Sequence, residues 1–141
     1  MFKNYDPGRV AVSFKGIQIR GIAKGTFVTA ERAEDAFSTD VGSAGDVTRV
    51  RSRNRTGTVT LTLQAASPTN DQLSAVALLD EKFGLSYGPL LIEDLNGTTL
   101  AHGADAWIKK LPSVQMADEA SDREWVFEVA ELELNAGGSL I

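Results

Sequence analysis

Alternation of apolar and polar residues, the pattern of strands with one buried face, recurs along most of this chain. It is clearest at residues 57–63 (GTVTLTL), where apolar side chains alternate with Thr58, Thr60 and Thr62. β-Branched residues favour such a half-buried sheet, and the glycine at position 57 marks its start. We therefore expect a strand whose apolar side faces the core and whose threonine side faces water.

Two longer alternating stretches change phase part-way along. Residues 9–22 switch their apolar side across Gly16, and residues 124–134 do so near Ala130. A strand that switches sides needs one extra residue, and glycine tolerates the backbone dihedral angles of that insertion. The sequence therefore predicts a strand bulged at Gly16 and a second long strand with a change of phase at Ala130.

One long helix is predicted over residues 67–83. Its start and stop signals are a capping Ser67, Pro68 at the first helical position, Asp71 in the first turn, Lys82 in the last turn and Gly84 after it. An apolar stripe follows the helical period: Leu73, Val76, Leu79 and Phe83. We expect that stripe to pack across one face of the sheet.

The dipeptide Asn96-Gly97 lies between two further apolar stretches, residues 90–95 and 98–109. Asn-Gly is the strongest short signal for a two-residue turn, because both central residues of that turn take positive φ. A β-hairpin with this tight turn is expected.

Residues 26–56 differ from the rest, because neither side of a strand here would be apolar. The second half places four guanidinium groups on one side of a strand: Arg49, Arg51, Arg53 and Arg55. The first half carries carboxylates on both sides, with Glu31 and Asp35 on one and Glu34 on the other. An isolated two-stranded ribbon is marginally stable in water, and polar faces fix its register weakly.

We interpret residues 26–56 as a projecting arm that neighbouring copies hold in place, with the arginine row meeting carboxylates across the subunit boundary. The alternative is a solvated hairpin with salt bridges between its own strands, each worth about 0.2 to 1 kcal/mol. A nucleic-acid site is a weaker interpretation, because stacking aromatic residues are missing and acidic residues lie nearby.

Composition narrows the class of protein. The 141 residues, of which 43% are hydrophobic, fit one domain spanning residues 1–141. A net charge of -5 disfavours attachment to phosphate backbones and to anionic lipids. No apolar run approaches the about 20 residues of a membrane helix, and the start of the chain lacks a signal peptide. We expect a protein made in the cytosol, without disulfides, since cysteine is absent.

Residues that could carry chemistry are few. His102 stands near Asp105, but strand residues surround it and suggest an ordinary polar position. An acidic cluster (Asp118, Glu119, Asp122 and Glu124) lacks the glycine-containing spacing of a calcium loop. A nucleophile elbow and a phosphate-binding glycine loop are also missing. The expectation is a protein that is not an enzyme, with no catalytic residue, metal ligand or cofactor.

The run SRNRTGTVTLTLQAASPTNDQLSAV (residues 52–76) resembles a segment of the tail-tube proteins of contractile-tailed bacteriophages, in which a glycine-led strand runs into a Ser-Pro-Thr-Asn helix start. The later pattern of strand, polar connection and aromatic strand (residues 106–134) is similar to that family in order and spacing. The resemblance covers roughly residues 10–136.

The resemblance implies a mainly β fold, a sandwich or partial barrel with one flanking helix and a projecting hairpin arm. It implies hexameric rings whose sheets join into one continuous inner β-barrel, stacked as a tube inside the tail sheath protein. The tape-measure protein would fill the bore before DNA passes, and baseplate and neck proteins would meet the tube ends. Such a protein is assembled in the host cytoplasm and becomes part of the virion.

A basic bore would retain DNA, since each cation that neutralises a phosphate strengthens binding. We therefore expect Thr58, Thr60 and Thr62 to line the lumen with part of the acidic excess, and the arginine row to lie in subunit contacts.

Two alternatives stay open. A tailocin or a type VI-like secretion system would use the same fold and rings. A monomeric β-sandwich binding module, for example a carbohydrate binder, would use Trp107 or Trp125 as a stacking platform.

Overall fold

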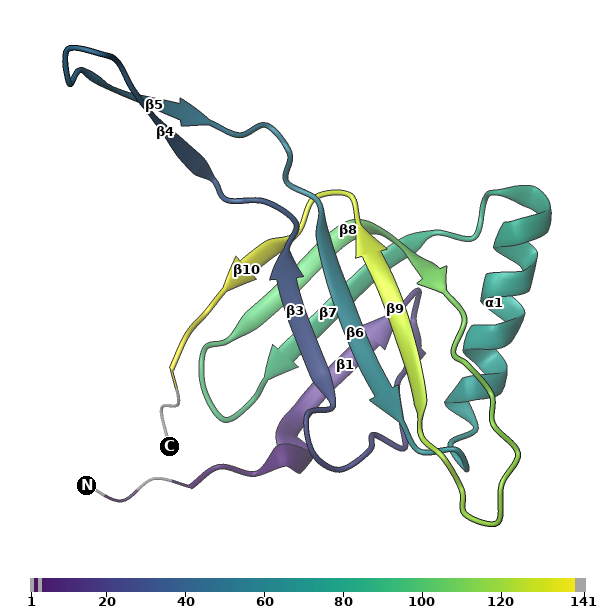
Figure 1. Cartoon of the computed structure of the whole chain (residues 1–141). Coiled ribbons are helices and arrows are strands. Elements are labelled where there is room, and N and C mark those ends of the chain that lie inside the picture. The colour runs from purple at the N-terminus through teal and green to yellow at the C-terminus, as the bar shows by residue number, and fades with distance from the viewer. Residues whose placement is uncertain (1, 3, 139–141) are drawn as a thin grey trace.

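The structure is a computed structural model that describes residue 2 and residues 4–138. Its elements follow the chain in the order shown in Figure 1: the 3-10 turn η1 (Pro7–Arg9), β1 (Val10–Phe14), β2 (Ile17–Gln18), β3 (Val28–Arg32), β4 (Phe37–Val41), β5 (Val47–Arg51), β6 (Gly57–Leu63), α1 (Thr69–Phe83), β7 (Gly88–Asp94), β8 (Leu100–Lys110), β9 (Arg123–Val129) and β10 (Glu133–Asn135). The expected mainly β fold with one helix is confirmed for the described residues. None of their helices is long and apolar enough to cross a membrane.

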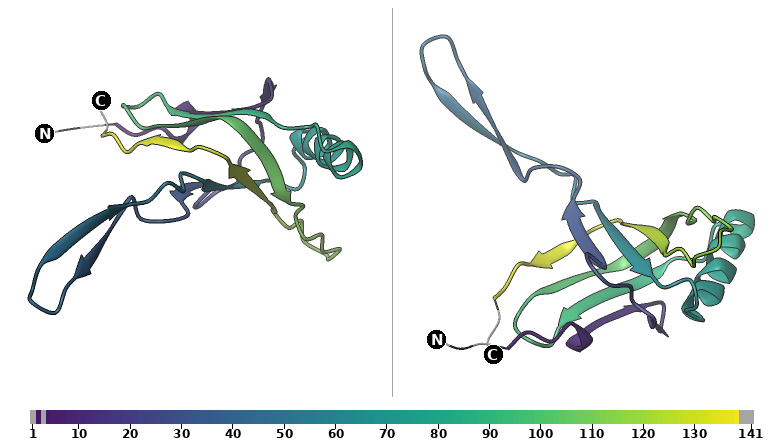
Figure 2. Two further views of the ribbon diagram at one scale, coloured as in Figure 1. Left: turned by 90° about the horizontal axis from the view of Figure 1, so that it is seen from above. Right: turned by 60° about the horizontal axis from the view of Figure 1, so that its bottom comes forward.

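One antiparallel sheet forms the body. Its strand order is β2-β1-β7-β8-β9-β6-β3, with β10 paired to β8. The long strand β8 belongs to both halves of the sheet, pairing first with β7 and then with β9. The sheet thereby folds over into two layers that diverge on the side of the termini (Figure 2). β2 and β3 remain at its two ends, so the described sheet is a partial barrel that does not close on itself.

The core lies between the two layers. The strand at residues 57–63 is confirmed as β6, whose apolar positions are buried while its threonines are half-buried. Phe14 and Phe127, from opposite layers, meet edge to face with ring centroids 5.0 Å apart. Trp125 is 1% exposed, and its indole Nε1–H donates to Asn70 Oδ1 at 3.0 Å. Each large apolar side chain buried in this way stabilises the fold by about 1.5 to 3 kcal/mol.

The predicted bulge at Gly16 is wrong. The chain reverses there in a tight hairpin, in which Phe14 of β1 pairs with Ile17 of β2. Lys15 has φ 51° and Gly16 has φ 80°, and two central residues with positive φ make the turn that matches the twist of the flanking strands. The change of phase in the sequence therefore marks a change of strand.

The hairpin around Asn96-Gly97 is confirmed, but its tight turn is wrong. Among the described residues positive φ occurs at Lys15 and at five other glycines, and not at this dipeptide. A wider loop spans residues 95–99, closed by Asp94 N–H donating to Thr99 O at 3.0 Å. The Asn96 side chain, 1% exposed, instead clamps the backbone of Asp6. Its Oδ1 accepts from Asp6 N at 3.1 Å, and its Nδ2 donates to Asp6 O at 2.8 Å.

The strand expected over residues 124–134 is two strands, β9 and β10. Between them the backbone bends, with Ala130 N–H donating to Asp105 O at 2.9 Å and Leu132 N–H donating to Arg55 O at 2.9 Å. The bend turns Leu132 into the core, where it is 1% exposed. It also carries the chain from the layer of β6 to the start of β8, where β10 pairs.

Helix α1 is confirmed, with Ser67 Oγ accepting from Thr69 N–H at 3.3 Å at its start and Gly84 (φ 69°) at its end. The expected buried stripe is only half right. Leu73 is buried and Val76 is partly buried against the core, but Leu79 is 49% and Phe83 is 68% exposed. The body covers the first part of the helix and leaves its last turns uncovered.

The arm is shorter than the expected residues 26–56. β3 belongs to the body, where it pairs with β6 and packs Val28 and Ala30 partly against the core. Residues 33–56, here called the arm, leave the body, and β4 and β5 form a separate two-stranded sheet in which every residue is exposed. Figures 1 and 2 show this ribbon projecting away from the body in every view.

Candidate assembly surfaces

The two faces of the arm ribbon differ in chemistry. Its register pairs Phe37 with Arg51, Thr39 with Arg49 and Val41 with Val47, and residues paired in this way share a face. We call this set the arm face: Phe37, Thr39, Val41, Val47, Arg49 and Arg51. The arm face carries two cations, three apolar residues and no acid. The opposite face carries Ser38, Asp40, Thr48 and Val50.

On the arm face, Arg49 lies over the ring of Phe37. The guanidinium carbon Cζ is 4.1 Å from the ring centroid. Such a contact contributes about 0.5 to 1 kcal/mol at an exposed site, which orients the arginine without burying it.

The base of the arm is fixed to the body and to itself. Arg55 forms an ion pair with Glu131 at 3.2 Å, with both side chains more than half exposed. Ser52 Oγ donates to Glu34 Oε2 at 3.0 Å, and Ser52 N–H donates to Ala36 O at 2.8 Å. The ribbon therefore leaves the body from a defined base.

The residues expected to act together on the arm are only partly brought together. Arg49 and Arg51 lie on one face of β5, whereas Arg53 and Arg55 follow the strand end. Glu34 and Asp35 lie in the connection before β4, and Glu31 lies on β3 in the body. Within the described residues the ion pairs are Arg55–Glu131 and His102–Glu133, so the ribbon has no salt bridge between its own strands.

The threonine side of β6 faces outward and lies in an acidic setting. Thr58 is flanked in register by Glu31 of β3 and Glu128 of β9, and Thr62 is opposite Glu124. The outward positions of β3, β6 and β9 include no lysine or arginine: Thr29, Glu31, Thr58, Thr60, Thr62, Glu124, Val126 and Glu128. This surface is hydroxyl-rich and negative.

Sequence reasoning missed an exposed apolar patch at the end of α1. The patch consists of large apolar side chains that are about half exposed or more: Leu78, Leu79, Phe83, Leu85 and Tyr87. A buried stripe was expected there, although the two adjacent leucines at 78 and 79 already made the apolar side of the helix too wide for one contact. Exposed apolar patches of this kind mark sites of association.

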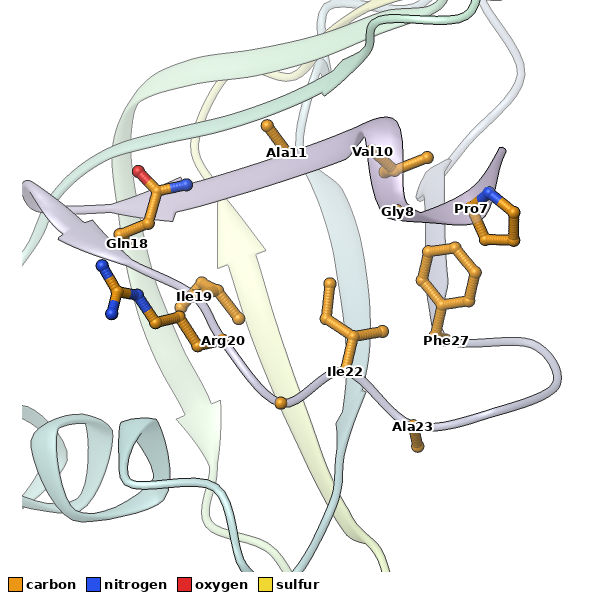
Figure 3. A pocket seen from close by; sticks show the side chains of 11 residues that line it. Pro7, Gly8, Val10, Ala11, Gln18, Ile19, Arg20, Ile22, Ala23 and Phe27 are labelled. Atoms are coloured by element: carbon orange, nitrogen blue, oxygen red, sulfur yellow. The ribbon is translucent and has the colours of Figure 1, made fainter. Parts of the chain in front are cut away.

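An open hollow of about 460 Å³ lies between η1, β1 and the segment after β2 (Figure 3). Ile19, Ile22 and Phe27 give it an apolar wall, and Arg20 is the charged residue of its lining. The lining holds no nucleophile paired with a base, so the hollow is a place for packing and not for chemistry.

The residues weighed for chemistry take ordinary positions. His102 Nε2 lies 3.4 Å from Glu133 Oε2 across β8 and β10, and both side chains are about half exposed. In the part of the chain that the structure describes, no three His, Cys, Asp or Glu side chains gather as a metal site. Trp125 is in the core, which removes it as a stacking platform for a sugar.

Comparisons with known proteins agree with this picture. Residues 9–137 match the family described as "Bacteriophage PhiTE tail tube protein". The chain is 27% identical to "Structural protein ORF10" of Pseudomonas phage KPP10 over 143 residues, covering 96% of this chain and 83% of that protein.

Solved structures share the fold at low identity. A chain of the sheath-tube complex of an extracellular contractile injection system (PVC) gives a TM-score of 0.61 at 15% identity, covering 94% of this chain and 92% of that one. The tube-terminating cap of the anti-feeding prophage gives 0.63 at 12% identity, covering 96% and 93%. Since the family match spans nearly the whole chain, the protein belongs to the phage tail-tube family and is a structural component of a phage tail.

Proposed function

We propose that six copies of this protein close into a ring and that the rings stack into the inner tail tube, which conducts DNA from the capsid to the host during contractile injection. The observation that carries the proposal is the open sheet, which ends at β3 on one side and at β2 on the other. Unpaired strand edges invite pairing with another chain, and a ring of copies uses them up. The whole chain, residues 1–141, acts as one tail-tube domain.

In this tube the threonine side of β6 lines the lumen. The absence of cations from the outward positions of β3, β6 and β9 supports the proposal. Transit requires weak binding, and a phosphate backbone finds no counterion on a surface of Thr58, Thr60, Thr62 and glutamates. DNA is therefore a passing cargo, and the tape-measure protein fills the same bore beforehand.

The arm contacts a neighbouring copy. Arg49, Arg51 and Arg53 have no partner carboxylate within 4.0 Å in the described part of their own chain, and Arg55 holds the base of the arm. Across a subunit boundary these guanidiniums meet carboxylates of the next copy, and the acids Glu31, Glu34 and Asp35 complete the polar contact.

The remaining partners follow from the place of the tube in a tail. The sheath protein surrounds the tube, as the sheath-tube complex of the PVC system suggests. Baseplate and neck proteins close its two ends, and the tube is assembled in the host cytoplasm before it becomes part of the virion.

Negative-stain microscopy of the purified protein, combined with sedimentation velocity, tests the proposal. We expect rings of six subunits or hollow rods. A monomer whose sedimentation coefficient does not change with concentration, and that forms neither rings nor rods, would refute the proposal.

A second candidate is the tube of a tailocin or of a type VI-like secretion system, favoured by the likeness to contractile injection systems that are not phage tails. Genes for capsid and terminase next to this one identify a phage tail, and their absence favours the second candidate.

A further inference from the structure

Two uncovered surfaces lie at opposite ends of the molecule. The arm leaves one end, whereas α1 and the connection at residues 111–122 form the other, in each of the three views (Figures 1 and 2). An arm built in this way points away from the helix end of its own chain. Any contact between the two surfaces must therefore join two copies.

The helix end is acidic. Residues 69–87 contain three acids and one lysine, and residues 111–122 contain three acids and no base. Together they carry a net charge of -5, which equals that of the whole chain. Lys110 and Arg123 border the second segment, and the Arg123 guanidinium already donates to the backbone of Ser121 at 2.9 Å. We call residues 69–87 and 111–122 the acidic end.

The acidic end is also apolar on its surface. It contains the patch at the end of α1, and the second segment adds Val114 at 58% and Met116 at 91% exposed. Asp118, Glu119 and Asp122 are exposed in that segment. Apolar side chains with carboxylates beside them suit a partner surface that combines apolar residues with cations.

The arm face is such a surface. It presents Val41 and Val47 at 60% and 68% exposed, and two arginines with no acid among them. Arg49 is already oriented by its contact with Phe37, so less side-chain entropy is lost when it binds a carboxylate.

We infer that the arm face of one copy docks on the acidic end of the next copy, head to tail. The inference rests on the proposed tube and names the surface that receives the arm. A contact between two different surfaces of one chain passes from copy to copy, which yields rings when the rotation closes and fibres when it does not. Nucleic acid is a poor occupant of the acidic end, because phosphates would meet carboxylates there.

Charge reversal on each side tests the docking. The arm variant carries Arg49→Glu and Arg51→Glu, and the acidic-end variant carries Asp118→Lys, Glu119→Lys and Asp122→Lys. All five residues are exposed, so both variants are expected to keep the circular dichroism spectrum and melting temperature of the wild type. A control variant adds acids to the opposite face of the arm, Ser38→Glu and Thr48→Glu.

We expect sedimentation velocity and negative-stain microscopy to find rings or rods for the wild type and the control, and no assembly for either reversed variant alone. An equimolar mixture of the two variants is expected to assemble, because each reversed surface then meets its complement around the ring.

Two results would overturn the inference and leave the proposed tube standing. One is normal assembly of either reversed variant, including an acidic-end variant that forms tubes but no longer binds sheath protein. The other is a mixture that stays unassembled, which would place the arm on a different surface. A wild type that never assembles would instead refute the proposed function.

Discussion

Excising the arm ribbon separates what it contributes to folding from what it contributes to assembly. The change replaces residues 38–50 with Asn-Gly, which suits a two-residue turn, and keeps Phe37, Arg51 and the base of the arm. The base retains the Ser52 N–H to Ala36 O bond and the Arg55–Glu131 ion pair. All ribbon residues are exposed, so little apolar burial is removed from the body.

The magnitude follows from the contacts that disappear. The stacking of Arg49 on Phe37 contributes about 0.5 to 1 kcal/mol, and a paired two-stranded ribbon is marginal by itself. The free energy of unfolding of the monomer is therefore expected to change by no more than about 1 kcal/mol. Ring formation is expected to be lost, because the arm face is gone.

Urea denaturation of the dissociated protein measures the first effect, and sedimentation velocity measures the second. Leu73→Ala serves as the control, because removing a fully buried leucine costs about 2 to 5 kcal/mol while the arm stays in place. A loss of more than about 3 kcal/mol in the excised protein would mean that the arm packs on its own body, and unchanged assembly would mean that it contacts no neighbour.

The other predictions concern the core, the lumen and one close backbone approach. Gly103→Ala would place a Cβ 2.1 Å from Val129 Cγ1 and 3.0 Å from Glu131 O, so we expect a loss of about 1 to 3 kcal/mol in urea denaturation, against little change for Gly42→Ala, whose added Cβ lies 3.7 Å from the nearest atom. Trp125→Phe removes the bond to Asn70 Oδ1 in a filled core and is expected to cost about 2 kcal/mol, and an unchanged urea midpoint would contradict that packing. Thr60→Lys puts a cation on the proposed lumen face, so tubes are expected to retain DNA in low salt and release it as salt rises, whereas Thr48→Lys on the arm should leave DNA retention unchanged.

Local patterns sufficed for the elements whose causes are local. β6 follows from strict alternation, and α1 follows from Ser67 at its start and Gly84 at its end. The two hairpin turns were assigned the wrong way round for reasons that are not local. Nothing near Lys15 announces a lysine with positive φ, while the Asn96 side chain leaves its expected turn to bind a segment 90 residues away.

The surfaces were harder to predict than the core. The polar pattern of residues 26–56 indicated an arm, but whether β3 pairs with β6 depends on long-range register that the pattern does not contain. The patch at the end of α1 escaped notice because Leu79 and Phe83 look like core residues in a helical period. A chain made for assembly keeps part of its apolar surface uncovered, and periodicity cannot tell that surface from a core.

The Asn96 clamp has a consequence for the chemical ageing of the particle. Asparagine followed by glycine is the pair most prone to deamidation, in which the backbone nitrogen of Gly97 attacks the side-chain carbonyl carbon of Asn96 and closes a succinimide. The clamp holds both polar atoms of that carboxamide against the backbone of Asp6, out of the attacking path and away from water. A virion does not resynthesise its subunits, so we expect this bond to outlast the same dipeptide in the unfolded chain, which mass spectrometry after prolonged storage of both states would measure.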